Sequence, residues 1–494
     1  MAALGLPLLL AAAPPVVRAE EIAAGRMPQC DYRVTLSDPA ARMLSVEADC
    51  RTAGPVELRP RTPLLRRHLA TLAVDGRPVE ALDLFDWQVP AVDGHARFAY
   101  RFDLDAAAAD DGSMDGARRF GRTVVAPLRT WLLAPAADGA DLRLRFEAPR
   151  GGTILTGLAA ADPQPVPAAA NAPVPPAVRL RANDLAFGGY ALLGTFRRYD
   201  FTLPASRLAP GEGPARITLG LPDPPFALSD EELLRWVIRS AEVVAGYWDG
   251  MPTRRSLFVL APEPMSGGVM FGRVRGGGGT TGFISLGEFT ERAQLYRSWE
   301  LIHEMMHLGS PFLHDGFWFM EGFATYAEPV ARARAGWRSA EDVWAEFLRG
   351  MPRGLAAMTG GGMGGRGIDT VYWGGALFML LADVAIRVQS GNRLGLEDCM
   401  RAVLSSGGDA AQRWRLDQAL AACDRATGGS AVSRLVQRHI HSAHPLDLEA
   451  LWRDLGVIRD GDGVTLVEDA PLAAIRRAIT GTAGGPKAGP PREG

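Results

Sequence analysis

The run WELIHEMMHLG, Trp299 to Gly309, decides how this chain is interpreted. On a helix, His303 and His307 are four residues apart and lie on one face. Two imidazoles on one face can bind one zinc ion, and Glu304 is placed to take a proton from a water molecule that the metal activates. The run therefore predicts a site for one zinc ion with Glu304 as general base. The alternative is a surface histidine pair on an ordinary helix.

A catalytic zinc ion needs three protein ligands and one open position, and three residues after the motif are candidates. His314 is out of register with the metzincin spacing of ligands. Asp315 stands at a turn that contains glycine and is interpreted as a loop residue. Glu321, in FWFMEGFATYAEP, opens a second amphipathic helix, and a carboxylate from an adjacent antiparallel helix can complete a site of two histidines and one glutamate. We expect Glu321 to be the third ligand.

The HExxH motif followed by EGFATY resembles the gluzincin clan of zinc metallopeptidases. The segment VYWGGALFMLLADVAIRVQSGNRLGLEDCMRAVL, Val371 to Leu404, resembles the glycyl aminopeptidase family and, more distantly, aminopeptidase N. This resemblance covers about Ser229 to Gly456 and implies a mainly helical, thermolysin-like catalytic domain with a small β-sheet that acts on a peptide or protein. It also implies that Tyr372 hydrogen-bonds the oxyanion of the reaction, which is chemically sensible beside a Lewis-acidic metal.

Two of the chain's departures from these families are single residues. Gly374 replaces the lysine that usually follows the tyrosine, and Met270 stands where a glutamate would grip the free amine of the substrate. No acid occurs between Pro264 and Gly287. Because an ammonium in a desolvated pocket needs a carboxylate partner, ordinary aminopeptidase action is disfavoured. Two alternatives to a zinc peptidase of open specificity remain: an aminopeptidase with an unidentified acid as amine anchor, and a non-catalytic zinc-containing peptide-binding protein.

A Gly-rich segment, Gly267 to Gly282, precedes the strand FISLG and is predicted to be a loop. It is interpreted either as a flexible edge of the active site, where the strand pairs with an extended peptide, or as a mobile surface loop. The first interpretation makes four residues candidates for substrate binding: Gly267, Gly268, Phe283 and Ile284. In the downstream segment, Asp383, Arg387 and Asp398 are interpreted as helix-packing or ion-pair residues.

The pattern of residue types along the chain predicts an α+β protein with two domains. Short alternating runs, such as ARFAYRFDL from Ala96, favour an antiparallel β-sandwich over residues 20–225, interrupted by a Pro-rich linker at 163–176. An amphipathic helix capped by Ser229 and a buried strand at 254–262 open a catalytic domain of residues 226–465. Helices are expected at 291–308, 320–334, 340–348 and 371–390, and residues 466–494 are expected to be a disordered tail.

The beginning of the chain indicates export. Leu4 to Ala13 is apolar but too short to span a bilayer, and Val17 and Ala19 fit a signal-peptidase site. Residues 1–19 are therefore predicted to be a signal peptide and the mature protein to be periplasmic or secreted, with a cytoplasmic protein as the alternative. No later stretch approaches the ~18 continuous apolar residues expected of a transmembrane helix.

Composition excludes several other functions. The net charge of -3 gives no excess of positive charge of the kind that binds nucleic acid. Lys487, near the C-terminus, is the only lysine, which excludes a phosphate-binding or Schiff-base lysine from the folded part. The four cysteines form two local pairs, Cys30 with Cys50 and Cys399 with Cys423, which would give two disulfides in an oxidising compartment. The sequence does not predict the oligomeric state.

Overall fold

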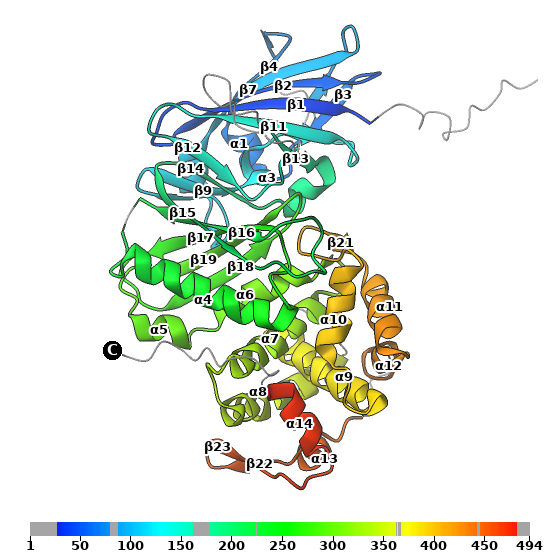
Figure 1. Cartoon of the computed structure of the whole chain (residues 1–494). Helices are drawn as coiled ribbons and strands as arrows, with labels where there is room; N and C mark the ends of the chain where they lie inside the picture. Colours follow the sequence, from blue (N-terminus) through cyan, green and yellow to red (C-terminus); the bar gives the residue numbers. More distant parts are fainter. Residues whose placement is uncertain are drawn as a thin grey trace, which may run out of the picture.

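The computed structural model of the chain describes residues 27–79, 87–161, 177–223, 225–361, 363, 367–441 and 445–481. The predicted signal peptide, the Pro-rich linker and the last part of the predicted tail lie outside the described residues. The molecule mixes helices and several sheets (Figure 1). This confirms the α+β expectation in its coarse form.

Three sheets make up the N-terminal part of the molecule, drawn in blue to cyan (Figure 1). The seven-stranded sheet has the order β13 (Val178–Arg181), β11 (Asp141–Glu147), β1 (Gln29–Leu36), β2 (Met43–Arg51), β7 (His95–Asp103), β4 (Leu69–Val74) and β5 (Arg77–Pro78). The three-stranded sheet has the order β10 (Ala134–Pro135), β3 (Val56–Arg59) and β6 (Trp87–Val89). The four-stranded sheet has the order β12 (Thr153–Thr156), β14 (Tyr190–Gly194), β9 (Thr123–Pro127) and β8 (Arg118–Phe120). The expected antiparallel pairing is wrong at one place, because β1 and β11 run parallel.

A five-stranded sheet follows, in the order β15 (Phe196–Leu203), β16 (Ala215–Pro222), β17 (Arg255–Glu263), β19 (Thr280–Gly287) and β18 (Val269–Arg275). The boundary predicted after residue 225 is therefore too late, because β15 and β16 belong to the same sheet as β17. The predicted Gly-rich loop is also wrong in part, since it contains the whole of β18. The apolar run VMF followed by the alternating RVR is a strand signal, which the flanking glycines obscured.

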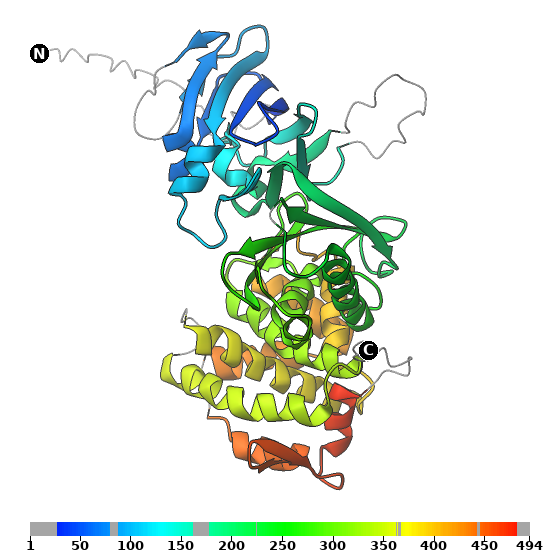
Figure 2. The same ribbon diagram turned by 90° about the vertical axis from the view of Figure 1, so that its left-hand side faces the viewer.

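Helices cover this sheet and fill the lower half of the molecule (Figures 1 and 2). The helices before the five-stranded sheet are α1 (Pro63–His68), α2 (Leu104–Asp110), α3 (Leu128–Trp131) and η2 (Ala182–Phe187). The later helices are α4 (Asp230–Trp248), α5 (Arg292–Arg297), α6 (Glu300–Met306), η3 (His307–Gly309), α7 (Phe317–Arg334), α8 (Ala340–Gly361), η4 (Asp369–Gly374), α9 (Gly375–Ser390), α10 (Leu396–Ser405), α11 (Leu416–Thr427), α12 (Ala431–Leu435), η5 (Val436–His441), α13 (Leu448–Leu455) and α14 (Ala473–Thr480). Two short strand pairs complete the chain: β20 (Phe312–Leu313) with β21 (Arg413–Trp414), and β22 (Val457–Asp460) with β23 (Gly463–Leu466).

Several predicted helix boundaries are confirmed and others are wrong. The helix expected at 340–348 continues to Gly361. Ser229 caps α4 in a capping box with Glu232, as the sequence pattern requires. The helix expected at 291–308 is two helices, because Ser298 is extended and its hydroxyl bonds to the carbonyl of Leu295. The tail expected from residue 466 includes α14, whose Ile479 is buried in the core, so the prediction is wrong up to residue 481.

Helix η4 and α9 form one apolar helical segment through the core. Among the described residues, this segment is the one helix long and apolar enough to cross a membrane. However, 72% of its most apolar stretch is buried inside the protein, as in the core helix of a globular domain. Its first turns carry Tyr372, so its packing fixes where that side chain stands.

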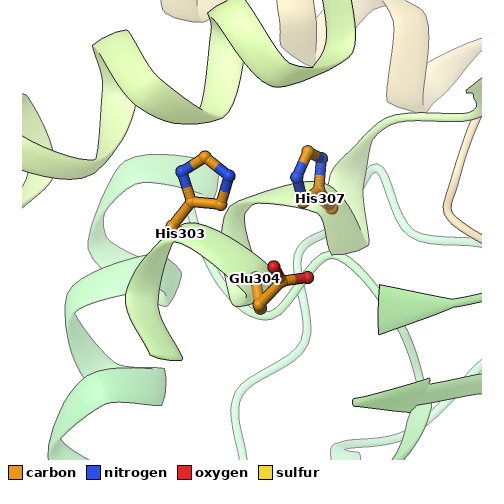
Figure 3. A group of neighbouring side chains, drawn as sticks. All are labelled: His303, Glu304 and His307. Atoms are coloured by element: carbon orange, nitrogen blue, oxygen red, sulfur yellow. The ribbon is translucent and has the colours of Figure 1, made fainter. Parts of the chain in front are cut away.

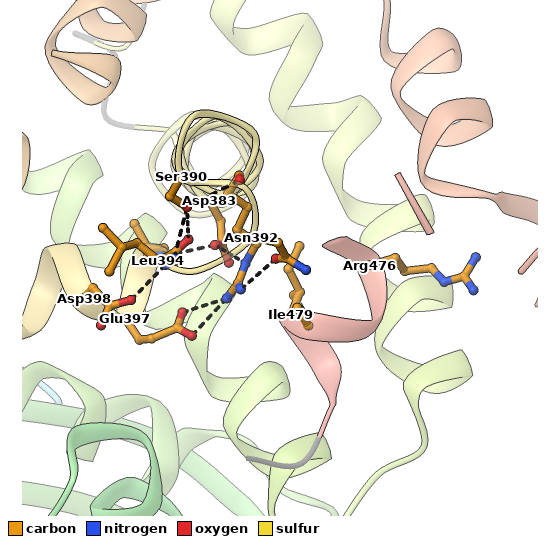
Figure 4. Close-up of polar contacts among 12 residues, drawn as sticks. Asp383, Ser390, Asn392, Leu394, Glu397, Asp398, Arg476 and Ile479 are labelled. Carbon is orange, nitrogen blue, oxygen red and sulfur yellow. Dashed lines mark hydrogen bonds and ion pairs between the residues drawn. The ribbon is translucent and has the colours of Figure 1, made fainter. Parts of the chain in front are cut away.

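A buried polar network holds the far end of α9 (Figure 4). Asp383 accepts hydrogen bonds from Arg387 at 2.8 Å, from the hydroxyl of Tyr326 at 2.7 Å and from the backbone N–H of Leu396 at 2.9 Å. Arg387 also pairs with Glu397 at 2.9 Å. The network ties α9 to α7 and α10. Asp383 and Arg387 are ion-pair residues, as predicted, and Asp398 accepts the backbone N–H of Gly395 at the start of α10.

Both predicted disulfides are present, Cys30–Cys50 between β1 and β2 and Cys399–Cys423 between α10 and α11. Each closes a short loop, of 20 and 24 residues in sequence separation. No free cysteine remains among the described residues.

Candidate metal centre

Helices α6 and α7 bring three potential metal ligands together. His303 lies in α6, His307 directly follows it, and Glu321 lies one turn into α7. The Oε2 atom of Glu321 is 3.2 Å from Nε2 of His303 and 3.6 Å from Nε2 of His307. Two imidazole nitrogens and one carboxylate oxygen thus converge on one point, which is a donor set that suits zinc.

The two other candidates for the third ligand point elsewhere. Nδ1 of His314 lies 3.0 Å from the carbonyl oxygen of Trp414, at β21. Asp315 accepts the backbone N–H of Leu416 at the start of α11. The loop between the two helices is thus fastened to β21 and α11. Glu321 alone of the three lies against both histidines.

Glu304 stands beside the histidines on the same helix (Figure 3). Ligand atoms of His303, Glu304 and His307 all lie within 4.8 Å of one another. Both histidines are buried, whereas Glu304 keeps some contact with solvent. This placement leaves Glu304 able to reach a small molecule next to the metal position.

The electrostatics of the centre separate the two carboxylates. Burial raises the pKa of Glu304, although the neighbouring histidines oppose this. Burial also opposes the ionisation of Glu321, but His307 and His303 outweigh it and hold its pKa well below the ordinary value. For His307, burial favours the neutral ring, but Glu321 outweighs it and raises the pKa. Glu321 is therefore the more acidic of the two carboxylates and Glu304 the more basic.

Aromatic rings fix the orientation of His303. The ring of Trp299 meets it edge-on at 4.9 Å between centroids, and the ring of Tyr372 is stacked on it at 6.0 Å. Burial raises the pKa of Tyr372, and the carboxylates of Glu321 and Glu304 raise it further. The phenol therefore keeps its proton at neutral pH and is able to donate a hydrogen bond.

The strand β18 holds Glu304 from the other side, and sequence reasoning missed this. The backbone N–H of Val274 donates to Oε2 of Glu304 at 2.6 Å. Gly272 packs against the same side chain, because a Cβ at this position would lie 2.6 Å from Cγ of Glu304. The apolar run Val269–Phe271 and the alternation in Arg273–Arg275 are the signal that could have found this strand.

The predicted substrate-binding residues do not line a free sheet edge. Phe283 and Ile284 are 0% exposed and lie in β19, which pairs with β17 on one side and β18 on the other. They cannot pair with a peptide, so this prediction is wrong. The backbone groups of Gly268 are also occupied, by Thr290 and Gly287. Gly267 stays a prediction, and the free edge of the sheet belongs to β18.

No model of a protein family matches the sequence, and no curated protein matches it. Among solved structures, an aminopeptidase N family protein from Idiomarina loihiensis superposes with a TM-score of 0.62 at 15% identity, covering 90% of this chain and 82% of that one. The fold is that of an aminopeptidase N family protein.

A second similar structure supports the same conclusion. A mutant M1 zinc metallopeptidase from Deinococcus radiodurans, bound to a Tyr-ser-ala substrate, superposes with a TM-score of 0.51 at 14% identity. The match covers 85% of this chain and 95% of that one. At such low identity the likeness concerns the fold, and the chemistry of this chain has to be argued from its own residues.

Proposed function

We propose that this protein is a zinc-dependent peptidase whose ion is held by His303, His307 and Glu321. The observation that carries the proposal is the convergence of two Nε2 atoms and one Oε2 atom beside a further carboxylate. The fold supports it, since both similar structures named above are described as an aminopeptidase N family protein or a zinc metallopeptidase. A zinc ion in this place would activate a water molecule and polarise the scissile carbonyl.

The residues of this chain have separate tasks in the proposed reaction. Glu304 takes the proton of the attacking water, and its raised pKa suits it to pass that proton to the leaving amine. The N–H of Val274 steadies the carboxylate while it does so. Tyr372 keeps its own proton and donates a hydrogen bond to the oxyanion that develops on the carbonyl.

We also propose a family and a location for this protein. The Val371–Leu404 segment favours a member of the gluzincin clan close to the glycyl aminopeptidase family, with a leading β-sandwich and a thermolysin-like catalytic part. Export to the periplasm or the medium is supported by two disulfides, which persist in oxidising compartments.

The edge strand beside Glu304 favours peptidase action that needs no free amine. Its charged residues are Arg273 and Arg275, and Met270 occupies the place expected for an amine-binding acid. We therefore expect a peptide with a blocked N-terminus to be cleaved as well as its free-amine twin. Loss of cleavage on blocking would instead support an aminopeptidase with its anchor elsewhere.

The decisive experiment replaces the proposed base without disturbing the ligands. Glu304→Gln keeps an oxygen for the N–H of Val274 but cannot accept a proton, so kcat should fall by about 10²- to 10⁴-fold with zinc content unchanged. Glu242→Gln, on the exposed face of α4, serves as the control and should be as active as the wild type. Unchanged activity of Glu304→Gln would exclude the chemistry, and failure of the zinc-loaded wild type to cleave any peptide of a library would favour a non-catalytic binding protein.

A further inference from the structure

Arg273 lies on the free edge strand, with its side chain on the face of β18 that pairs with Asp115 and not on the face that meets Glu304. It stands between Gly272, which packs against Glu304, and Val274, which donates to Glu304. Because the N–H of Val274 points away from β19, the outer edge of β18 is directed at the metal centre. An extended peptide bound along this edge would pass both Glu304 and Arg273.

The two arginines of β18 differ in how far their hydrogen-bonding capacity is used. Arg275 is 11% exposed, donates to the hydroxyl of Tyr190 at 3.1 Å and pairs with Asp115. Arg273 is 46% exposed, and its one ion pair among the described residues joins Nε to Asp115 at 3.3 Å. Arg275 is thus a structural residue of the interface with the N-terminal part. Arg273 presents free N–H groups to solvent.

The surroundings of Arg273 compensate its positive charge only in part. Asp115 is shared by Arg273 and Arg275, which outweigh the effect of burial and hold its pKa below the ordinary value. The sequence places no acid on β18 or in the turns that flank it, from Pro264 to Gly287.

We propose that Arg273 binds a carboxylate group of the peptide substrate, so that the protein selects anionic peptides. The inference rests on the proposed peptidase function and names its substrate class. A guanidinium with free N–H groups matches a carboxylate in geometry and charge, and it repels the ammonium that an amine-binding acid would attract. The carboxylate comes either from an acidic side chain or from the C-terminus of the peptide.

Binding to an inactive protein tests this without relying on turnover. Three N-blocked fluorescent peptides of one sequence are used: one with Glu and a C-terminal amide, one with Gln and a free C-terminus, and one with Gln and an amide. Their Kd values for the zinc-loaded Glu304→Gln full chain are measured by fluorescence anisotropy, with and without Arg273→Gln. Arg239→Gln, on the exposed face of α4, is the matched control.

At least one anionic peptide should bind about 10- to 100-fold more tightly than the neutral one, as expected for a hydrogen bond between charged groups. Arg273→Gln should abolish this preference, Arg273→Lys should keep part of it and Arg239→Gln all of it. Whichever anionic peptide shows the preference identifies the source of the carboxylate.

Two outcomes overturn the inference: equal binding of all three peptides, or a preference that survives Arg273→Gln. Cleavage by the wild type is scored separately. Peptides that bind with the expected preference but are never cleaved would refute the peptidase and leave the role of Arg273 standing. Cleavage by the wild type without any binding preference would refute the role of Arg273 and leave the peptidase function standing.

Discussion

Replacing Gly272 by alanine should displace the proposed base while sparing the metal ligands. The new Cβ would lie 2.6 Å from Cγ of Glu304 and 3.3 Å from its Cδ and Oε1. Carbon atoms in contact prefer about 3.5 to 4.0 Å, so the side chain has to retreat by roughly 1 Å. The first of these contacts involves Cγ and not the flexible end of the side chain, so a rotation of the carboxylate alone does not relieve it.

The expected result is a loss of activity larger than the loss of stability. A misplacement of about 1 Å in a catalytic group costs on the order of 10²-fold in rate. Overpacking costs about 1–3 kcal/mol of folding free energy. Replacing a glycine within a strand by alanine stabilises the fold and offsets part of this cost. We therefore expect kcat/KM to fall about 100-fold, with a modest change in Tm and a full complement of zinc.

The assay is cleavage of a peptide substrate of the wild type, with metal content and thermal melting measured on the same sample. Gly246→Ala is the control, because a Cβ at that position of α4 meets nothing within 4 Å. In a Glu304→Ala background the clash is gone, so Gly272→Ala should then cost little more. Wild-type kcat/KM in a folded Gly272→Ala protein would refute the reasoning, and so would fully additive effects in the double variant.

Three further perturbations test other parts of the centre. Tyr372→Phe removes the donor for the oxyanion, so kcat should fall by about 10²- to 10³-fold with KM and zinc content almost unchanged; a change confined to KM would contradict the assigned role. Glu321→Gln removes the anion between the two histidines, so zinc should be lost to a chelator at a concentration that the wild type withstands; equal retention would show that Glu321 is not a ligand. Burial raises the pKa of Glu328, beside Arg332, to about 7. Between the ordinary pKa of a glutamate and pH 7, the folded protein therefore keeps a proton on Glu328 that the unfolded chain has already released. The stability that this group contributes is lost as pH rises toward 7, by about 1 to 3 kcal/mol, and urea unfolding at pH 5 to 8 should show that Glu328→Gln flattens this dependence.

The sequence by itself determined the residues of the centre. Spacing on a helix placed His303 and His307 on one face, and the same local rules located α4 and its cap at Ser229. Glu321 followed from the chemistry of zinc, which needs a third ligand from a neighbouring helix. The pairing of cysteines close in sequence was also correct, because each pair closes a short loop.

Only the tertiary structure decided which strand meets the centre. Local patterns do not state the order of strands in a sheet, so the strong strand β19 was taken for the edge, although it lies between β17 and β18. The weaker, glycine-flanked β18 is the edge, and its pairing with β19 sends the N–H of Val274 to Glu304 and leaves Arg273 partly exposed. The proposed base is encoded locally, whereas what holds it and what faces its substrate depend on contacts between residues about 30 positions apart.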